Sequence, residues 1–219
     1  MRAARPIIIR VAAAAIASLV LTACFTGERA HFADTADATA AAVSDPAIQA
    51  VLTGLAAANT EQFTATYDVI TKFGNVSTTA TVAQSAPGTT SVTIGHVRFL
   101  TQQSGSQTCE LTTGACATGT QDQQISDTQL THDFYSSSAA LRLRQDVNTM
   151  VSAAVASTKQ IAGQAATCAE VFFAAGSKTY CALANGLLAQ QDTPDLRIDL
   201  TSLTTGADTA LFTPTTVAG

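Results

Sequence analysis

The sequence predicts an α+β protein built around a large antiparallel sheet. Short segments that alternate apolar and polar residues follow one another from Phe63 to the C-terminal region, and Gly, Asn or Pro turns separate them. Two other segments carry apolar residues at helical spacing, one before the strands and one between two groups of strands. Because helices and strands do not alternate along the chain, an α/β fold is excluded.

Asp45-Pro46 predicts the start of the first helix, because Asp is a favoured N-cap and Pro fits the first helical position. Asn59 is expected to end it. The apolar face of this helix is formed by Ile48, Val51, Leu52 and Leu55. Strands are then expected at 63–71, 76–84, 89–94 and 97–102, followed by a hairpin of 108–111 with 115–117.

The segment 119–132 is polar and is expected to be irregular. A second helix is predicted over 139–156, with a face formed by Leu143, Val147, Met150, Val151 and Ala154. Strands are expected again at 159–167, 170–174, 179–184, 187–191, 196–203 and 209–212.

The first 23 residues have the layout of a secretory signal peptide. Arg2, Arg5 and Arg10 carry the only charged side chains of the first 27 residues, and they flank an apolar run over 11–21. This run is too short for a membrane-spanning helix, which needs about 20 apolar residues. The sequence therefore predicts an exported protein.

Leu21-Thr-Ala-Cys24 ends the apolar run and resembles the lipobox of bacterial lipoproteins. In that family the cysteine thiol is lipidated and the chain is cut before it, so the resemblance implies lipidation at Cys24. Two or three acyl chains give stable anchoring, whereas one does not. Residues 24–44 would form a tether, and 45–219 a single domain at the extracellular face of the plasma membrane. The alternatives are an ordinary signal peptide with an incidental cysteine, and a single signal anchor.

The mature chain would be acidic. The sequence has 11 Lys and Arg and 16 Asp and Glu; without the three leader arginines, 8 minus 16 gives a net charge of −8. An acidic chain with no basic cluster argues against nucleic acid as a partner, and against electrostatic docking on anionic lipid.

Four cysteines remain besides Cys24, and an even number in an exported protein predicts disulfides. Three connectivities are open. The local one, Cys109 with Cys116 and Cys168 with Cys181, is favoured because both pairs bracket turn residues. A metal site would need Cys and His at closer spacing, so neither a metal nor a cofactor is expected.

No catalytic constellation is found, and an enzyme is not expected. His132, Asp133 and the serines at 136–138 are close in sequence, but helix capping explains the serines better than a catalytic triad does. No Gly-x-Ser-x-Gly or phosphate-binding loop occurs.

Several motifs resemble those of the LolA-like lipoprotein carriers and the related glycolipid-binding lipoproteins of the LppX and LprG type. They are Phe63-Thr-Ala-Thr-Tyr67, Gln84-Ser-Ala-Pro87, the pair Cys109 and Cys116, the late run from Ile161-Ala-Gly163 through Cys168 and Tyr180-Cys181 to Gly186-Leu187-Leu188, and Phe212-Thr-Pro214. The resemblance implies a curved, open half-barrel sheet capped by two or three helices, with an apolar hollow that takes acyl chains.

A curved sheet under amphipathic helices is a common setting for a lipophilic ligand, so a lipid or glycolipid ligand is one hypothesis. The candidate ligand-lining residues are Phe63, Tyr67, Val69, Val92, Ile94, Phe99, Val147, Val151 and Leu200. The alternative is that these side chains fill a core and that the domain is an envelope interaction or sensing module with no ligand.

Overall fold

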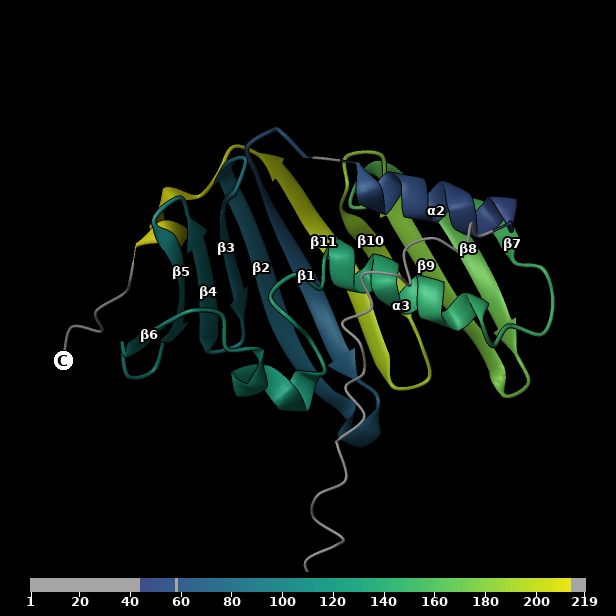
Figure 1. Cartoon of the computed structure of the whole chain (residues 1–219), viewed down its shortest axis with the longest axis horizontal. Coiled ribbons are helices and arrows are strands. Elements are labelled where there is room, and N and C mark those ends of the chain that lie inside the picture. The colour runs from purple at the N-terminus through teal and green to yellow at the C-terminus, as the bar shows by residue number, and fades with distance from the viewer. Residues whose placement is uncertain (1–43, 58, 214–219) are drawn as a thin grey trace, which may run out of the picture. The chain divides into compact units, whose positions relative to one another are not determined.

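The computed structural model describes residues 44–57 and 59–213. These residues form one open, eleven-stranded antiparallel sheet with two α-helices (Figure 1), which confirms the predicted α+β class and the curved sheet. The predicted signal peptide, Cys24 and all but the last residue of the predicted tether lie outside the described residues. No helix within the described ranges is both long and apolar enough to cross a membrane.

The strand order is β6-β5-β4-β3-β2-β1-β11-β10-β9-β8-β7. The helices are α2 (Pro46–Ala56) and α3 (Ser137–Val147), and short 3-10 turns are η2 (Phe73–Asn75), η3 (Asp122–Thr128) and η4 (Thr209–Phe212). The strands are β1 (Phe63–Thr71), β2 (Val76–Ala86), β3 (Thr89–Ile94), β4 (Val97–Gln102), β5 (Gly105–Glu110), β6 (Cys116–Thr118), β7 (Val155–Ile161), β8 (Gln164–Phe173), β9 (Gly176–Leu183), β10 (Leu188–Asp192) and β11 (Leu196–Thr205).

Strand β1 is the centre of the sheet, because it pairs β2 on one side and the last strand, β11, on the other. Its alternate residues Phe63, Ala65, Tyr67 and Val69 are buried, as the sequence pattern predicts. The predicted limits of β1, β3 and β4 are confirmed without change.

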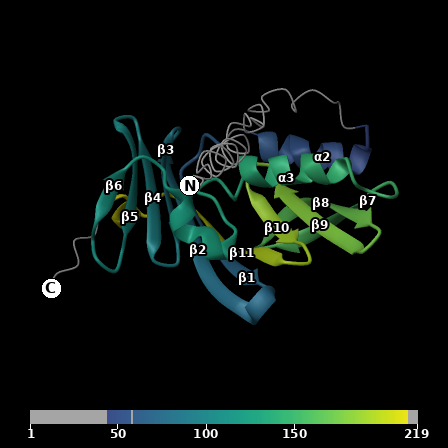
Figure 2. The ribbon, with the colours of Figure 1, turned by 60° about the horizontal axis from the view of Figure 1, so that its bottom comes forward.

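Both helices cover the half of the sheet that runs from β10 to β7 (Figure 2). Asp45 is the N-cap of α2, as predicted: its Oδ1 accepts from the backbone N–H groups of Ala47 and Ile48 at 2.9 and 3.2 Å. Its Oδ2 accepts from Ala154 N at 2.8 Å, just before β7. Gly54 then lets α2 approach the sheet closely, because a Cβ there would lie 2.9 Å from Ala182 Cβ.

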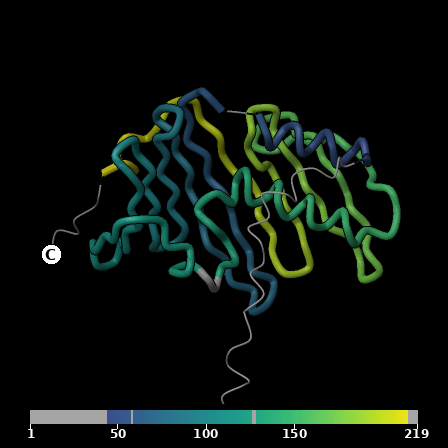
Figure 3. Tube along the Cα trace, viewed as in Figure 1, coloured from purple at the N-terminus to yellow at the C-terminus, as the bar shows by residue number. Residues whose placement is uncertain are grey.

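The other half of the inner face is covered by the connection from β6 to α3, residues 119–136 (Figure 3). This segment, predicted to be polar and irregular, buries Ile125, Leu130 and Phe134, each no more than 5% exposed. These three side chains belong to the same apolar cluster as the strands beneath them. The connection therefore covers the inner face of β1 to β5, as the helices cover that of β7 to β10.

The prediction of a helix over 139–156 is wrong at its C-terminal end, because α3 ends at Val147. Asn148 N donates to Asp146 O and Gln145 O, and Thr149 donates to Asp146 O through both its N–H and its hydroxyl. These tight bonds satisfy the last carbonyls and stop the helix. Val151 N then donates to Phe172 O, and the Val151 side chain is 63% exposed.

Two strand predictions are also wrong. The expected strand 159–167 is interrupted by Ala162 and Gly163, whose φ values of 48° and 74° make the two-residue turn of a β7–β8 hairpin. The expected strand 209–212 is the 3-10 turn η4, because Asp208 Oδ1 caps it by accepting from Ala210 N at 3.0 Å.

The predicted disulfide pairing is confirmed. Cys109 is bonded to Cys116 across β5 and β6, and Cys168 to Cys181 across β8 and β9. Each pair joins residues that are direct neighbours in adjacent antiparallel strands, which is why a short sequence separation suffices.

We expect the buried tyrosines to ionise only when the protein unfolds at high pH. Burial raises the pKa of Tyr67 and of Tyr180 above the ordinary value, with Tyr135 nearby adding to the effect on Tyr67 and Asp146 adding to that on Tyr180. The folded protein holds the phenolic proton more tightly than the unfolded chain does. The free energy of unfolding is therefore independent of pH below the unfolded pKa of about 10, and it falls as the pH rises above that value. Two such groups give a slope of about 2.7 kcal/mol per pH unit, and Tyr135, whose pKa burial also raises, adds to it.

Tyrosinate absorbance near 295 nm and far-ultraviolet circular dichroism, followed in one alkaline titration, check this expectation. Absorbance from both groups should rise together with the loss of dichroism, and Tyr67→Phe should remove part of the slope. Full ionisation near pH 10 in a protein that keeps its dichroism would contradict the burial of these hydroxyls.

Candidate functional site

Seven of the nine predicted ligand-lining residues are less than 5% exposed and belong to the apolar core: Phe63, Tyr67, Val69, Val92, Ile94, Phe99 and Leu200. Val147 is half-buried against that core, whereas Val151 is exposed and lies beyond the end of α3. Phe63 is the one member of the set that lines the cavities described below. The structure therefore does not gather the predicted set around a common hollow.

The connection 119–136 explains why the predicted hollow is filled. Phe134 packs edge-on against Tyr67, with ring centroids 5.2 Å apart. His132 lies over Phe99, with centroids 6.1 Å apart. Side chains from the connection thus occupy the space above the strands where the sequence placed a ligand.

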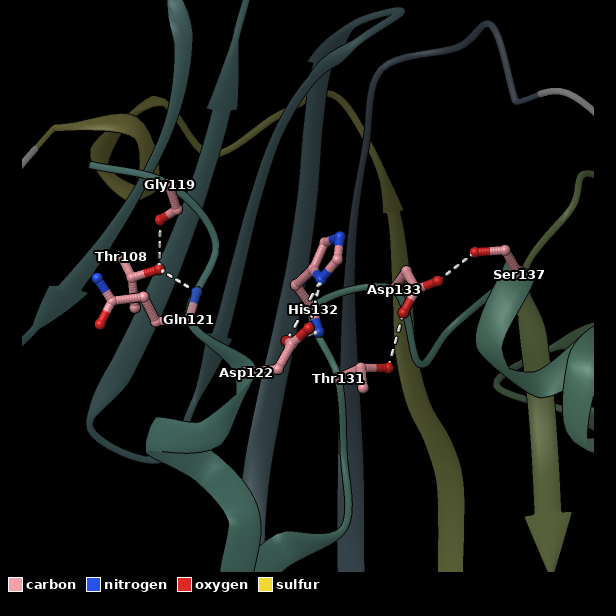
Figure 4. A network of polar contacts seen from close by, with 8 residues as sticks. All are labelled: Thr108, Gly119, Gln121, Asp122, Thr131, His132, Asp133 and Ser137. Atoms are coloured by element: carbon pink, nitrogen blue, oxygen red, sulfur yellow. Dashed lines mark hydrogen bonds and ion pairs between the residues drawn. The ribbon is translucent and has the colours of Figure 1, made fainter. Parts of the chain in front are cut away.

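Polar contacts hold this connection in place (Figure 4). Thr108 on β5 donates its hydroxyl to Gly119 O at 2.8 Å and accepts from Gln121 N at 3.0 Å. Asp122 accepts from His132 N at 2.7 Å, and its carboxylate lies 3.0 Å from His132 Nδ1. The connection is therefore tied to the sheet near its start, and its two halves are tied to each other.

His132, Asp133 and Ser137 belong to two separate contacts. The His132 ring pairs with Asp122, while Ser137 Oγ donates to the Asp133 carboxylate, which also accepts from Thr131 Oγ1 at 2.7 Å (Figure 4). Ser137 and Asp133 thus sit at the entry to α3, where the sequence placed a helix start.

A cavity of about 400 Å³ lies where α2 ends, α3 begins and β1 enters the sheet; we call it the α2–α3 cavity. Its lining residues are Leu55, Ala56, Ala57, Asn59, Phe63, Gln84, Tyr135, Ser136, Ser137, Ala140, Arg144, Gly186 and Leu187. The α3 contribution is the stripe Ser137, Ala140 and Arg144, which helical spacing places on one face.

Small residues open this cavity. Ala56 and Ala57 end α2, and Ser136, Ser137 and Ala140 begin α3, so few long side chains enter the space between the helices. Three apolar side chains, Leu55, Phe63 and Leu187, lie beneath the cavity and are each no more than 5% exposed, whereas polar atoms supply the larger part of the exposed lining. The backbone closes one side, where Leu188 N donates to Tyr135 O at 2.7 Å.

Polar groups are placed at the rim of the apolar floor. Gln84 Nε2 donates to Asn59 O and Glu61 O at 2.7 and 3.0 Å and so fixes the loop that follows α2. The Asn59 Nδ2 atom is buried and has no hydrogen-bond partner among the described residues. Arg144 is half-buried on the α3 wall and makes no ion pair within the described part of the chain.

A second cavity of about 280 Å³ adjoins the first and shares Asn59 and Phe63 with it. The end of β11 and the β9–β10 turn form its other walls, including Leu203 and Asn185. Asn185 Oδ1 is also buried without a hydrogen-bond partner among residues 44–57 and 59–213. The residue with the unpaired donor, Asn59, thus lines both cavities, and the residue with the unpaired acceptor, Asn185, lines the second.

Sequence reasoning misses most of these residues. It singles out Gln84 only as part of a turn-like motif, and Ser136 and Ser137 only as caps. The usable signals are the alternation of β1, which points Phe63 inward at the start of the strand, and the helical spacing that places Leu55 on the apolar face of α2. The remaining walls come from loops whose approach depends on tertiary packing.

No protein-family model matches this sequence, and no curated protein matches it. Among solved structures, a chain of the Pseudomonas aeruginosa MucA/MucB complex is similar, with 13% identity and a TM-score of 0.46 over 76% of this chain and 60% of that chain. MucB in complex with MucA(peri) gives 15% identity and a TM-score of 0.44 over 75% and 57%. MucB gives 14% and 0.41 over 73% and 58%. The chain thus spans less than two thirds of the length of the chains it matches.

Proposed function

We propose that this chain is an extracytoplasmic lipoprotein, anchored through Cys24 at the outer face of a bacterial plasma membrane, which binds a small amphiphile and catalyses no reaction. The leader, the lipobox resemblance and the two disulfides support the compartment. The resemblance to LolA-like carriers supports an amphiphilic ligand.

The anchor has a direct test. Cys24→Ala is expected to release the protein to the medium or to remove the acyl mass, which fractionation and intact-mass measurement detect. A variant that stays acylated and membrane-bound would contradict the anchor.

The α2–α3 cavity is the observation that carries the ligand proposal. Its volume of about 400 Å³ falls at the lower end of the range for ligand pockets, roughly 300–1,000 Å³. This size favours one short apolar chain over a lipid with several chains. The buried floor of Leu55, Phe63 and Leu187 suits that chain.

Arg144 suggests the charge of the head group. A guanidinium that has no carboxylate partner among the described residues favours an anionic group, which it can hold with two parallel hydrogen bonds. Asn59, another lining residue, adds an unpaired donor, its buried Nδ2. The ligand class is therefore a single-chain amphiphile with a carboxylate or phosphate head.

Cavity variants test this proposal by titration with decanoate and decyl phosphate. Ala140→Trp should fill the space and abolish binding, whereas Leu141→Trp, at an exposed position one residue further along α3, should bind like the wild type. Arg144→Gln should weaken binding about tenfold, the usual cost of a lost charge-assisted hydrogen bond, and Arg142→Gln should not. Equal binding by Ala140→Trp and Leu141→Trp would exclude the cavity as the site.

A second candidate function, an envelope interaction module, is favoured by Phe73. This side chain is 90% exposed at the β1–β2 turn, next to Val76 at 55%. Aromatic residues are common anchors in protein interfaces. Replacing Phe73 with Ser should leave decanoate binding unchanged and, under this second function, should abolish capture of the partner from the membrane fraction.

A further inference from the structure

A third cavity, of about 220 Å³, lies on another side of α3, between that helix and the sheet; we call it the α3–β10 cavity. Positions 142, 145 and 146 face it, whereas positions 137, 140 and 144 face the α2–α3 cavity. The two cavities share no lining residue. An inference about this one is therefore independent of the proposed function.

Several polar groups in the wall already have partners. Asp146 accepts from Lys178 Nζ and from Tyr180 Oη, each at 2.6 Å. Lys178 Nζ also lies 4.8 Å from the centre of the Phe173 ring. The Thr193 hydroxyl donates to Leu196 O and accepts from Leu196 N. These groups build the wall and have little capacity left for a ligand.

Gln191 is the exception. It is 1% exposed on β10, yet its Nε2 has no hydrogen-bond partner among the described residues. Leaving a buried amide donor unpaired costs roughly 1–3 kcal/mol, so this donor calls for an acceptor, from a water molecule or from a ligand.

Two charged groups that line the same cavity also lack an ion-pair partner within 44–57 and 59–213. Arg142 donates one N–H to the backbone carbonyl of Gln129, which leaves most of its guanidinium donors unused. The Asp195 carboxylate lies at the exposed edge. With Lys178 and Asp146 neutralising each other, the lining has one unpaired positive and one unpaired negative group.

We propose that the α3–β10 cavity binds a small zwitterion of amino-acid size. Its carboxylate accepts hydrogen bonds from Gln191 Nε2 and Arg142, and its ammonium lies against Asp195. The volume equals that of about seven water molecules at about 30 Å³ each, so a short amino acid fits with room for water beside it. The balanced charge of the lining disfavours ligands with a net charge.

Isothermal titration calorimetry with L-serine, L-alanine and L-threonine tests this. At least one should bind with a Kd of about 1 mM or tighter. Propionate lacks the ammonium and ethanolamine lacks the carboxylate, so each should bind at least about tenfold more weakly. The absence of heat for all three amino acids up to about 10 mM would overturn the proposal.

Variants separate this site from the rest of the chain. Gln191→Leu should weaken binding about tenfold while keeping or raising the melting temperature, because it removes an unpaired amide. Gln160→Leu makes the same change on the exposed strand β7 and should have no effect. Arg142→Gln should weaken binding and Arg144→Gln should not, the reverse of their expected effects on decanoate. Unchanged affinity in Gln191→Leu would overturn the proposal.

Discussion

Replacing Gly186 with Ala is expected to destabilise the protein by about 4 kcal/mol, combining backbone strain with a backbone clash. Gly186 has a φ of +90°, a conformation that costs a non-glycine residue roughly 1–2 kcal/mol. A Cβ there would also lie 2.1 Å from Ala57 O, where the turn before β10 meets the end of α2. The contacting atom is backbone, so relief requires the α2 end to move.

Gly163→Ala is the matched control. Its φ of +74° imposes similar strain, but a Cβ there meets no atom within 4 Å. We expect a loss of about 1 kcal/mol, from strain alone. Urea unfolding followed by circular dichroism gives both values. If the two variants lose the same stability, α2 does not approach the β9–β10 turn as described.

Replacing Asp146 with Ala should cost about 3 kcal/mol, because it breaks a largely buried ion pair and leaves two partners behind. Asp146 joins α3 to β9: its carboxylate takes Lys178 Nζ and Tyr180 Oη at 2.6 Å each. Its side chain is 12% exposed and that of Lys178 is 27%. Without it, a poorly hydrated ammonium and a buried hydroxyl lose their acceptor.

The pair formed by Lys72 and Asp192 provides the control. Its Nζ–Oδ1 distance is also 2.6 Å, but the side chains are 40% and 36% exposed. Asp192→Ala should therefore cost less than about 1 kcal/mol. Urea midpoints at constant slope compare the two. A smaller loss for Asp146→Ala than for Asp192→Ala would show that this carboxylate does not hold α3 to the sheet.

Short sequence patterns predict those parts of the fold that depend on interactions between residues close in sequence. The alternation in β1 indicates its limits and its inward face, and Asp45-Pro46 indicates the start of α2. The short spacing of Cys168 and Cys181 predicts the disulfide, because the two residues face each other in one hairpin. Each of these features is decided within a few residues of sequence.

Other features depend on contacts that the sequence does not display. The end of α3 is decided by hydrogen bonds from Asn148 and Thr149, although apolar spacing continues to Ala154. The three buried side chains of the connection 119–136 stand among polar residues, so no apolar pattern in the sequence indicates that they are buried. The hollow implied by the resemblance to the LolA-like carriers therefore includes Tyr67, whereas in the structure Phe134 packs against this side chain.

The candidate cavities are not predictable for the same reason. The α2–α3 cavity is made by the end of one helix, the start of another, two strands and a turn. It arises because small residues such as Ala57 and Ala140 meet at the same place, which no period in the sequence encodes.

Native mass spectrometry of the secreted domain, purified without added ligand and then titrated with decanoate, tests the central claim most directly. The account predicts one bound amphiphile per chain for the wild type and for Leu141→Trp, and none for Ala140→Trp. Wild-type protein that stays unliganded at saturating decanoate and decyl phosphate would contradict the claim that the α2–α3 cavity is a binding site.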